Sequence, residues 1–192
     1  MISYQDILNS IDKSDISVIG YNFKSETIKD ELISNFDYVE ISEIDSSFCF
    51  KSFLRNLKLN RILGNSVKNP DYILLDLTKI KYDIDLDGLG SRQKQTKRIL
   101  EKLHSQIYEG RQSSFPSTPK LKVIITCPLY KSGTNSEGNP VNSFIGGSGP
   151  IYISDFVVSI FDDKITIIKD RIHDNCGKIL YKHYEKLTNF VE

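Results

Sequence analysis

Short runs of apolar residues constrain the fold of this chain more than any other feature. Residues 72–75 read Tyr-Ile-Leu-Leu one residue after the breaker Asn69-Pro70, and residues 16–19 and 123–126 are similar runs. Such runs are typical of strands that helices cover on both faces, because these strands have no polar side to expose. Segments with apolar residues at helical spacing separate them. This alternation predicts an α/β fold with a mainly parallel sheet.

Polar residues mark where the elements begin and end. Ser3, Ser25 and Ser91 each precede a helical pattern, so we expect helices after these serines, the last of them ending at Gly110. The other predicted elements are a strand at 38–42, a helix at 48–63, loops at 110–119 and 131–150, and short strands at 156–160, 164–169 and 178–184. Tight polar turns join the last three strands, which predicts antiparallel strands at the C-terminal edge of the sheet.

Length and charge bound the possible functions. The chain has 192 residues, which favours one domain over 1–192 with one sizeable core. Its 25 basic and 25 acidic residues cancel, which argues against a protein that coats nucleic acid through its global field. Acidic residues dominate 26–45 and basic residues dominate 92–131. Solvated helix faces are the simplest interpretation of both runs, but a local basic face also binds phosphates.

The cysteines and histidines predict neither disulfides nor a metal site. No C-x-x-C spacing occurs, and the histidines share no motif spacing; these residues are Cys49, Cys127, Cys176, His104, His173 and His183. The chain also lacks a run of about 18 apolar residues and a signal-like N-terminus. We therefore expect a cytoplasmic protein that does not contact a membrane.

Four pieces of sequence carry candidate functional residues. Asp76 ends a buried strand, where a carboxylate can orient the water shell of Mg²⁺ beside a phosphate. Glu43 lies in an acidic turn after the expected strand at 38–42. The glycine-rich stretch at 146–149 allows backbone to approach nucleic acid closely. Lys169 and Arg171 alternate along a strand, so they can grip one phosphate together, although an exposed pair on an edge strand has the same pattern.

The order of these pieces resembles the RecA-like ATPase core that RecA-type recombinases and DnaB-type helicases share. The resemblance covers about residues 16–184 and implies a RecA-like three-layer domain. It also implies that Asp76 lies at the end of a Walker B strand and that Glu43 polarises the attacking water. Lys169 and Arg171 would reach the γ-phosphate that a neighbouring subunit holds.

The phosphate-binding loop departs from that family. A P-loop reads G-x-x-x-x-G-K-[ST], whereas this chain has Gly-Tyr-Asn-Phe-Lys-Ser at 20–25. The loop is two residues short, and Phe23 replaces the glycine before the lysine. Lys24 and Ser25 could hold an anion at the helix start, or Ser25 is only a helix cap and Lys24 is exposed. Binding of ATP and Mg²⁺ is therefore expected to be weakened or lost.

The sequence predicts a RecA-like protein of DNA replication, recombination or repair. It would bind single-stranded DNA, and assemble as a homo-oligomer or on a related RecA-like ATPase. The residues expected to contact DNA are Arg92, Lys94, Lys131, Asn142, Gly146 and Gly147. Two alternatives stay open. One is an active, DNA-stimulated ATPase with an unconventional P-loop, and the other is a non-enzymatic structural or inhibitory protein that docks on a RecA-like ring or filament.

Overall fold

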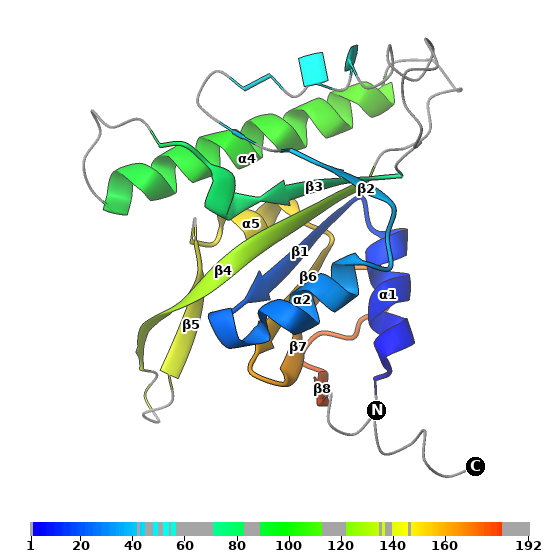
Figure 1. Ribbon diagram of the computed structural model, residues 1–192, viewed down its shortest axis with the longest axis vertical. Coiled ribbons are helices and arrows are strands. Elements are labelled where there is room, and N and C mark those ends of the chain that lie inside the picture. The colour runs from blue at the N-terminus through cyan, green and yellow to red at the C-terminus, as the bar shows by residue number, and fades with distance from the viewer. Residues whose placement is uncertain are drawn as a thin grey trace.

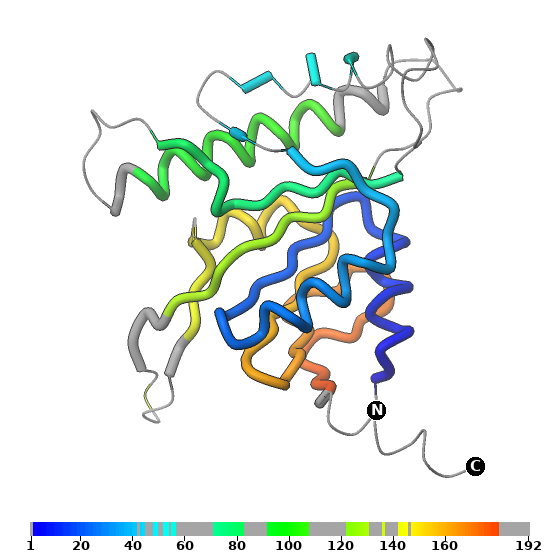
Figure 2. Tube along the Cα trace, in the orientation of Figure 1, coloured from blue at the N-terminus to red at the C-terminus, as the bar shows by residue number. Residues whose placement is uncertain are grey.

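A central sheet lies between two helical layers in the computed structural model of the chain (Figures 1 and 2). The structure describes residues 2–41, 43–44, 48–49, 52–53, 55–56, 71–82, 89–112, 122–134, 136, 140–145 and 147–181. None of the helices in this part of the chain is long and apolar enough to cross a membrane.

The sheet is mostly parallel and has the strand order β2-β3-β4-β1-β6-β7-β8, with β5 paired to β4. The parallel strands are β1 (Ile16–Tyr21), β2 (Tyr38–Glu40), β3 (Tyr72–Asp76), β4 (Lys122–Thr134) and β6 (Phe156–Phe161). The antiparallel strands are β5 (Pro140–Phe144), β7 (Lys164–Asp170) and β8 (Ile179–Tyr181). The predicted α/β fold with antiparallel strands at the C-terminal edge is confirmed.

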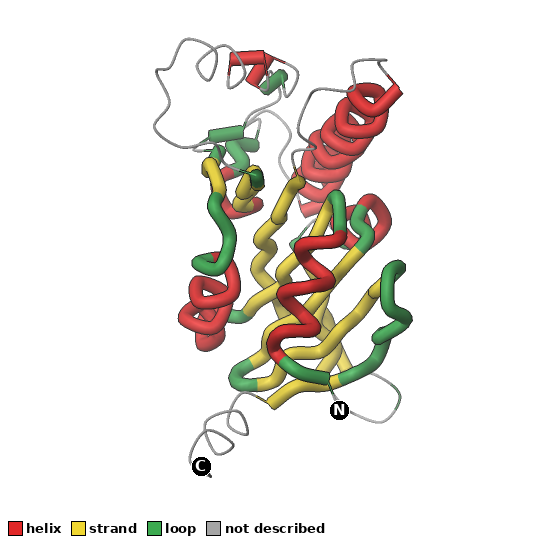
Figure 3. The backbone as a smooth tube through the Cα atoms, turned by 90° about the vertical axis from the view of Figure 1, so that its right-hand side faces the viewer, coloured by secondary structure: helices red, strands yellow, loops and turns green. Residues whose placement is uncertain are grey.

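Two cores, one on each face of the sheet, give the molecule three layers. Alternate residues of β1 point to opposite faces, so Ile16 and Val18 pack on one side and Ile19 on the other. The Ile16 side is covered by α4 (Leu89–Gln112) and α5 (Gly149–Ile153), and the Ile19 side by α1 (Tyr4–Lys13) and α2 (Glu26–Ile33). Figure 3 shows the sheet between these layers.

Helix caps explain some boundaries and the tertiary structure explains others. Ser3 forms a reciprocal capping box with Asp6, as its position predicts. α4 begins at Leu89 and continues to Gln112, so the predictions that Ser91 caps it and that Gly110 ends it were both wrong. The predicted loop at 110–119 is helical at 110–112. The rest of that loop and most of the predicted helix at 48–63 lie outside the described residues.

The predicted loop at 131–150 contains regular structure instead. β4 continues to Thr134 and pairs with β5 to form a hairpin, which we call the arm, and α5 begins at Gly149. The glycines and prolines that suggested a loop lie near the ends of these elements. Pro150 stands in the first turn of α5, where its missing N–H costs no hydrogen bond.

Candidate functional site

The carboxyl ends of β1 and β3 lie on either side of the middle of β4. Gly20 is level with Cys127, and Asp76 is level with Thr126. After β1 the chain passes to α2 on one face, whereas after β4 it passes through the arm to α5 on the other face. Open α/β sheets bind ligands at a point where the connections from two neighbouring strands go to opposite faces of the sheet. The predicted residues Lys24, Ser25 and Asp76 all lie at or just after these carboxyl ends.

The polar groups of the turn after β1 are engaged in hydrogen bonds within the turn and to Asp162. The backbone N–H of Ser25 donates to Oδ1 and to the carbonyl oxygen of Asn22, at 3.0 and 2.9 Å. The Ser25 hydroxyl also contacts Asn22 Oδ1 and donates to the carbonyl oxygen of Asp162 at 3.0 Å. Asn22 Nδ2 donates to Asp162 Oδ1 at 3.1 Å. Ser25 is therefore buried with both its amide and its hydroxyl engaged, while Lys24 is exposed.

Negative charge surrounds this turn. The pKa of Tyr21 is raised to about 12, first by burial and then by nearby negative charges that include Asp76, Glu26 and Asp30. Lys29 is buried against the Tyr21 ring, with Nζ 4.5 Å from the ring centroid. Its ammonium is already paired with Asp30 at 3.0 Å and with Glu26 at 3.6 Å. A phosphate here would meet carboxylates, and the buried cation is already neutralised.

The predicted catalytic acids have other local contacts. Asp76 Oδ1 accepts the backbone N–H of Thr78 at 2.9 Å and so begins the short 3₁₀ helix η2 (Leu77–Lys79). Glu43 forms an ion pair with Lys81, and the described contacts do not bring it to Asp76. Within the described ranges, no group of three or more His, Cys, Asp or Glu side chains is placed to hold a metal ion.

Side chains of the arm cover β1 at Gly20 on the α4 side of the sheet. A Cβ atom at Gly20 would lie 2.5 Å from Phe144 Cε1 and 3.0 Å from Leu129 Cδ2, so the Phe144 ring rests directly on the β1 backbone. Burial also raises the pKa of the Cys127 thiol to about 12, which keeps it protonated. Sequence reasoning missed Phe144 because it lay in a predicted loop.

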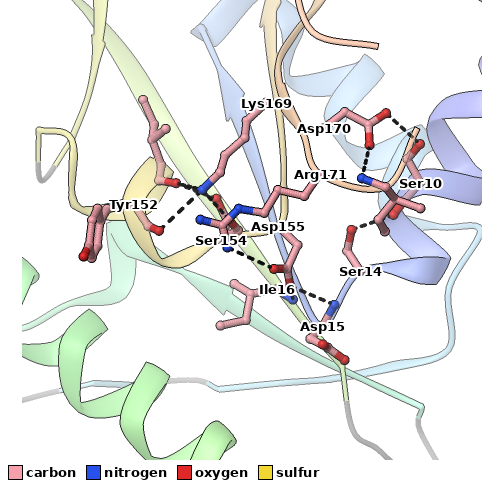
Figure 4. Close-up of polar contacts among 12 residues, drawn as sticks. Ser10, Ser14, Asp15, Ile16, Tyr152, Ser154, Asp155, Lys169, Asp170 and Arg171 are labelled. Carbon is pink, nitrogen blue, oxygen red and sulfur yellow. Dashed lines mark hydrogen bonds and ion pairs between the residues drawn. The ribbon is translucent and has the colours of Figure 1, made fainter. Parts of the chain in front are cut away.

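Lys169 binds the carboxyl end of α5 (Figure 4). Its ammonium donates to the carbonyl oxygens of Ile151, Ser154 and Tyr152 at 2.7, 2.5 and 3.4 Å. Burial lowers the pKa of Lys169, and the nearby charge of Arg171 lowers it further. Cations at a helix C-terminus satisfy carbonyls that have no intrahelical partner.

Arg171 lies beside Lys169 but binds the connection before β6 (Figure 4). Its Nη1 is 3.7 Å from Asp155 Oδ1, while Asp155 Oδ2 accepts the backbone N–H groups of Asp15 and Ile16. These contacts lie at the amino ends of β1 and β6, on the edge opposite to Lys24 and Asp76. The structure thus gives Lys169 and Arg171 local roles, and their trans role stays a prediction.

The exposed face of α4 carries a basic ridge. We give this name to Lys94, Arg98 and Lys102, which are exposed and follow one another at four-residue spacing. Lys97 beside the ridge pairs with Glu101 at 3.7 Å, and the Arg92 guanidinium lies 5.7 Å from the Tyr82 ring centroid. Among the described residues, Lys94 and Arg98 have no carboxylate partner. The part of the basic run at 92–102 is thus a solvated helix face, as predicted.

The glycine-rich turn lies next to this helix. A Cβ atom at Gly149 would be 3.6 Å from Leu100 Cδ1 and 4.0 Å from the Lys97 Cα atom. Gly147 has φ +65°, and a side chain there would meet open space. The fold therefore brings two of the predicted DNA-contacting segments together, since 147–149 packs against α4.

The arm holds the remaining predicted DNA contacts. Lys131 on β4 is level with Asn142 on β5, and Asn142 Oδ1 is buried without a hydrogen-bond partner among the described residues. Figure 1 shows the arm on the same side of the molecule as the amino-terminal end of α4. Gly146 and the side chain of Lys131 lie outside the described part of the chain.

One exposed aromatic was missed by sequence reasoning. Phe23 is 86% exposed at the tip of the turn that Asn22 and Ser25 hold. The sequence showed that the bulk of Phe23 is incompatible with a P-loop. It did not show that the ring is exposed, because the turn is held by hydrogen bonds from Asn22 and Ser25 to Asp162, which is far away in the chain.

Comparisons with known proteins give no family. No protein-family model matches the sequence, and no curated protein matches it. A solved structure from Pyrococcus horikoshii OT3, described as a structural study of project PH0250, aligns with 88% of this chain and 92% of its own. The TM-score is 0.39 and the sequence identity is 10%. A likeness of this size carries no argument about function, so the function has to be argued from the residues themselves.

Proposed function

We propose that the chain is a RecA-like protein of DNA replication, recombination or repair that binds DNA and has lost ordinary nucleotide binding. It acts through contacts with single-stranded DNA, with a related ATPase, or with both. The basic ridge of α4 carries this proposal, because it is an exposed row of cations on the helix against which the turn at 147–149 packs. The sequence resemblance supplies the biological setting.

The arrangement of the ridge supports a polyanionic ligand. Lys94, Arg98 and Lys102 are like charges at four-residue spacing, and each such pair destabilises a helix by about 0.2–0.5 kcal/mol. A phosphate backbone would reverse this cost by neutralising the row. Backbone contacts of this kind carry affinity without reading sequence. We therefore expect binding that depends on salt and not on base sequence.

The turn at 22–25 supports the loss of nucleotide binding. A P-loop needs free backbone N–H groups around a phosphate, whereas the Ser25 N–H donates to Asn22. Asp76, Glu26 and Asp30 make the surroundings negative. Lys24, the other residue predicted to bind the nucleotide, has an exposed side chain.

Fluorescence anisotropy with a labelled single-stranded oligonucleotide tests the DNA part. The wild type should bind, and the affinity should fall steeply as the salt concentration rises. K94A/R98A should weaken binding and lower the slope of log K against log salt by about 1.4, or about 0.7 per lost contact. The matched control K164A/K178A removes two charges from β7 and the turn before β8, and should bind as the wild type does. Equal binding by both variants would refute the assignment to α4.

Calorimetric titration with ATP and Mg²⁺, with and without the oligonucleotide, tests the nucleotide part. No binding is expected in either condition. Micromolar binding that K24A abolishes would instead favour the unconventional ATPase, and Mg²⁺-dependent turnover lost in E43Q would establish it.

A further inference from the structure

The two helical layers carry opposite charge. Residues 92–102 on α4 have five exposed cations and one exposed acid, Glu101. On the other face of the sheet, the exposed ionisable side chains of 26–37 are all acidic: Glu26, Asp30, Glu31 and Asp37. Lys29 is buried beneath them. Even with Lys24 and Lys29 counted, four acids against two lysines leave 24–37 with a net charge of −2.

These charges do not neutralise each other within one molecule. α2 and α4 cover opposite faces of the sheet, as their separate cores show. A helix with its side chains is about 10 Å across, so two helices and the sheet separate the two solvent faces by more than about 20 Å. The Debye length at physiological salt is about 8 Å, so attraction between the faces is screened across the monomer. A chain with zero net charge therefore has one acidic and one basic face.

We propose that a second copy of this chain docks head to tail, with the acidic face of its α2 against the basic ridge of α4. Contact brings the opposite charges within a few ångströms, which a monomer cannot do. The two surfaces differ, so the contact is heterologous and each copy keeps one free face for the next. Because the ridge is also the proposed DNA-binding surface, a docked copy and DNA exclude each other.

Sedimentation velocity without nucleic acid tests the contact. At about 50 mM salt the average mass of the wild type should exceed the 22.0 kDa of one chain and rise with protein concentration. At about 500 mM salt it should return to one chain. K94E/R98E reverses two charges of the ridge and should stay monomeric at both salts. The matched control K164E/K178E changes the net charge equally but leaves both helices unchanged, and should associate at least as well as the wild type does.

A charge-swapped partner makes the test specific. T27K/E31K turns α2 basic at two exposed positions and leaves the pairs of Lys29 with Glu26 and Asp30 in place. It should be monomeric alone and should associate when mixed with K94E/R98E. In the mixture the intact ridge of T27K/E31K can bind the intact acidic face of K94E/R98E, and the basic α2 of the first can bind the acidic α4 of the second. A monomeric wild type at low salt, or no association in the mixture, would overturn the proposal.

The DNA competition is measured separately, so the two proposals can fail independently. T27K/E31K keeps the ridge and should bind the oligonucleotide at least as well as the wild type. Added oligonucleotide should dissociate wild-type assemblies. Assembly that persists under saturating oligonucleotide would contradict the shared surface, whereas assembly without any DNA binding would refute the proposed function alone.

Discussion

At the scale of single residues, the contribution of a buried polar side chain to stability depends more on its hydrogen-bond partner than on its residue type. Ser17 and Ser14 are both buried, and the sequence gives no means of ranking them. Ser14 donates to the carbonyl oxygen of Ser10 at 2.7 Å, whereas the Ser17 hydroxyl has no partner among the described residues. A buried hydroxyl without a hydrogen bond costs about 1–3 kcal/mol.

The two serines should therefore respond oppositely to the same substitution. S17A should raise the free energy of unfolding by about 1 kcal/mol, because it removes an unpaired polar group. S14A should lower it by about 1 kcal/mol, because it removes a satisfied hydrogen bond. Urea unfolding of both variants measures this difference. A loss of stability in S17A as large as in S14A would show that the Ser17 hydroxyl has a partner.

At the scale of elements, α5 and the arm are each held by a contact between residues that are far apart in the sequence. The glycines at 146–149 indicated a loop, yet α5 begins at Gly149, and Lys169 on β7 binds the carbonyls at its end. Hydrogen bonds to a charged group contribute about 1.5–3 kcal/mol. K169M should therefore lower the free energy of unfolding by about 1–2 kcal/mol in urea, and K164M, on the same strand, should change it by less than about 0.5 kcal/mol. Equal effects would mean that Lys169 does not hold α5.

The arm is positioned by the contact of Phe144 with the backbone of Gly20. G20A places a methyl group against the Phe144 ring, and such overpacking costs about 1–3 kcal/mol. F144L shortens the side chain and should relieve the clash, so the double variant should lose less stability than the two single variants combined. A double-mutant cycle in urea measures this coupling. Strict additivity would place the Phe144 ring away from Gly20.

At the scale of the whole molecule, three carboxylates hold α1 and its contacts. The backbone N–H and hydroxyl of Ser3 lower the pKa of Asp6, and hydrogen bonds from Lys122 and Tyr72 lower that of Asp12. Burial acts to raise the pKa of Asp170, but hydrogen bonds from the backbone N–H groups of His173 and Ile172 and from the Asn175 side chain, with the charge of His173, together lower it. Asp170 also accepts from Ser10 of α1 at 3.4 Å.

Acid should therefore loosen α1. A carboxyl group whose pKa is lower in the folded state stabilises the fold above its unfolded pKa, and this stability is lost as the pH falls through the folded pKa. The free energy of unfolding should thus decrease below about pH 4, where unfolded aspartates begin to protonate. Hydrogen exchange should show faster exchange in α1 under these conditions. D170N should be less stable than the wild type at neutral pH, and the difference should shrink in acid; a constant difference would contradict this assignment.

The sequence alone determined the fold class, the positions of most strands along the chain and the basic face of α4, because burial periodicity and charge are local properties of the chain. The strand after Asn69-Pro70, the antiparallel edge and the cap at Ser3 could all be predicted this way. Only the tertiary structure decided that Asn22 and Asp162 form hydrogen bonds with Ser25 and that Lys169 binds the carbonyls at the end of α5. It also decided that Phe144 packs on Gly20 and that the acidic and basic faces lie on opposite sides of the sheet. These features join residues far apart in the chain, and a local pattern records which side chains are present but not which of them the fold brings together.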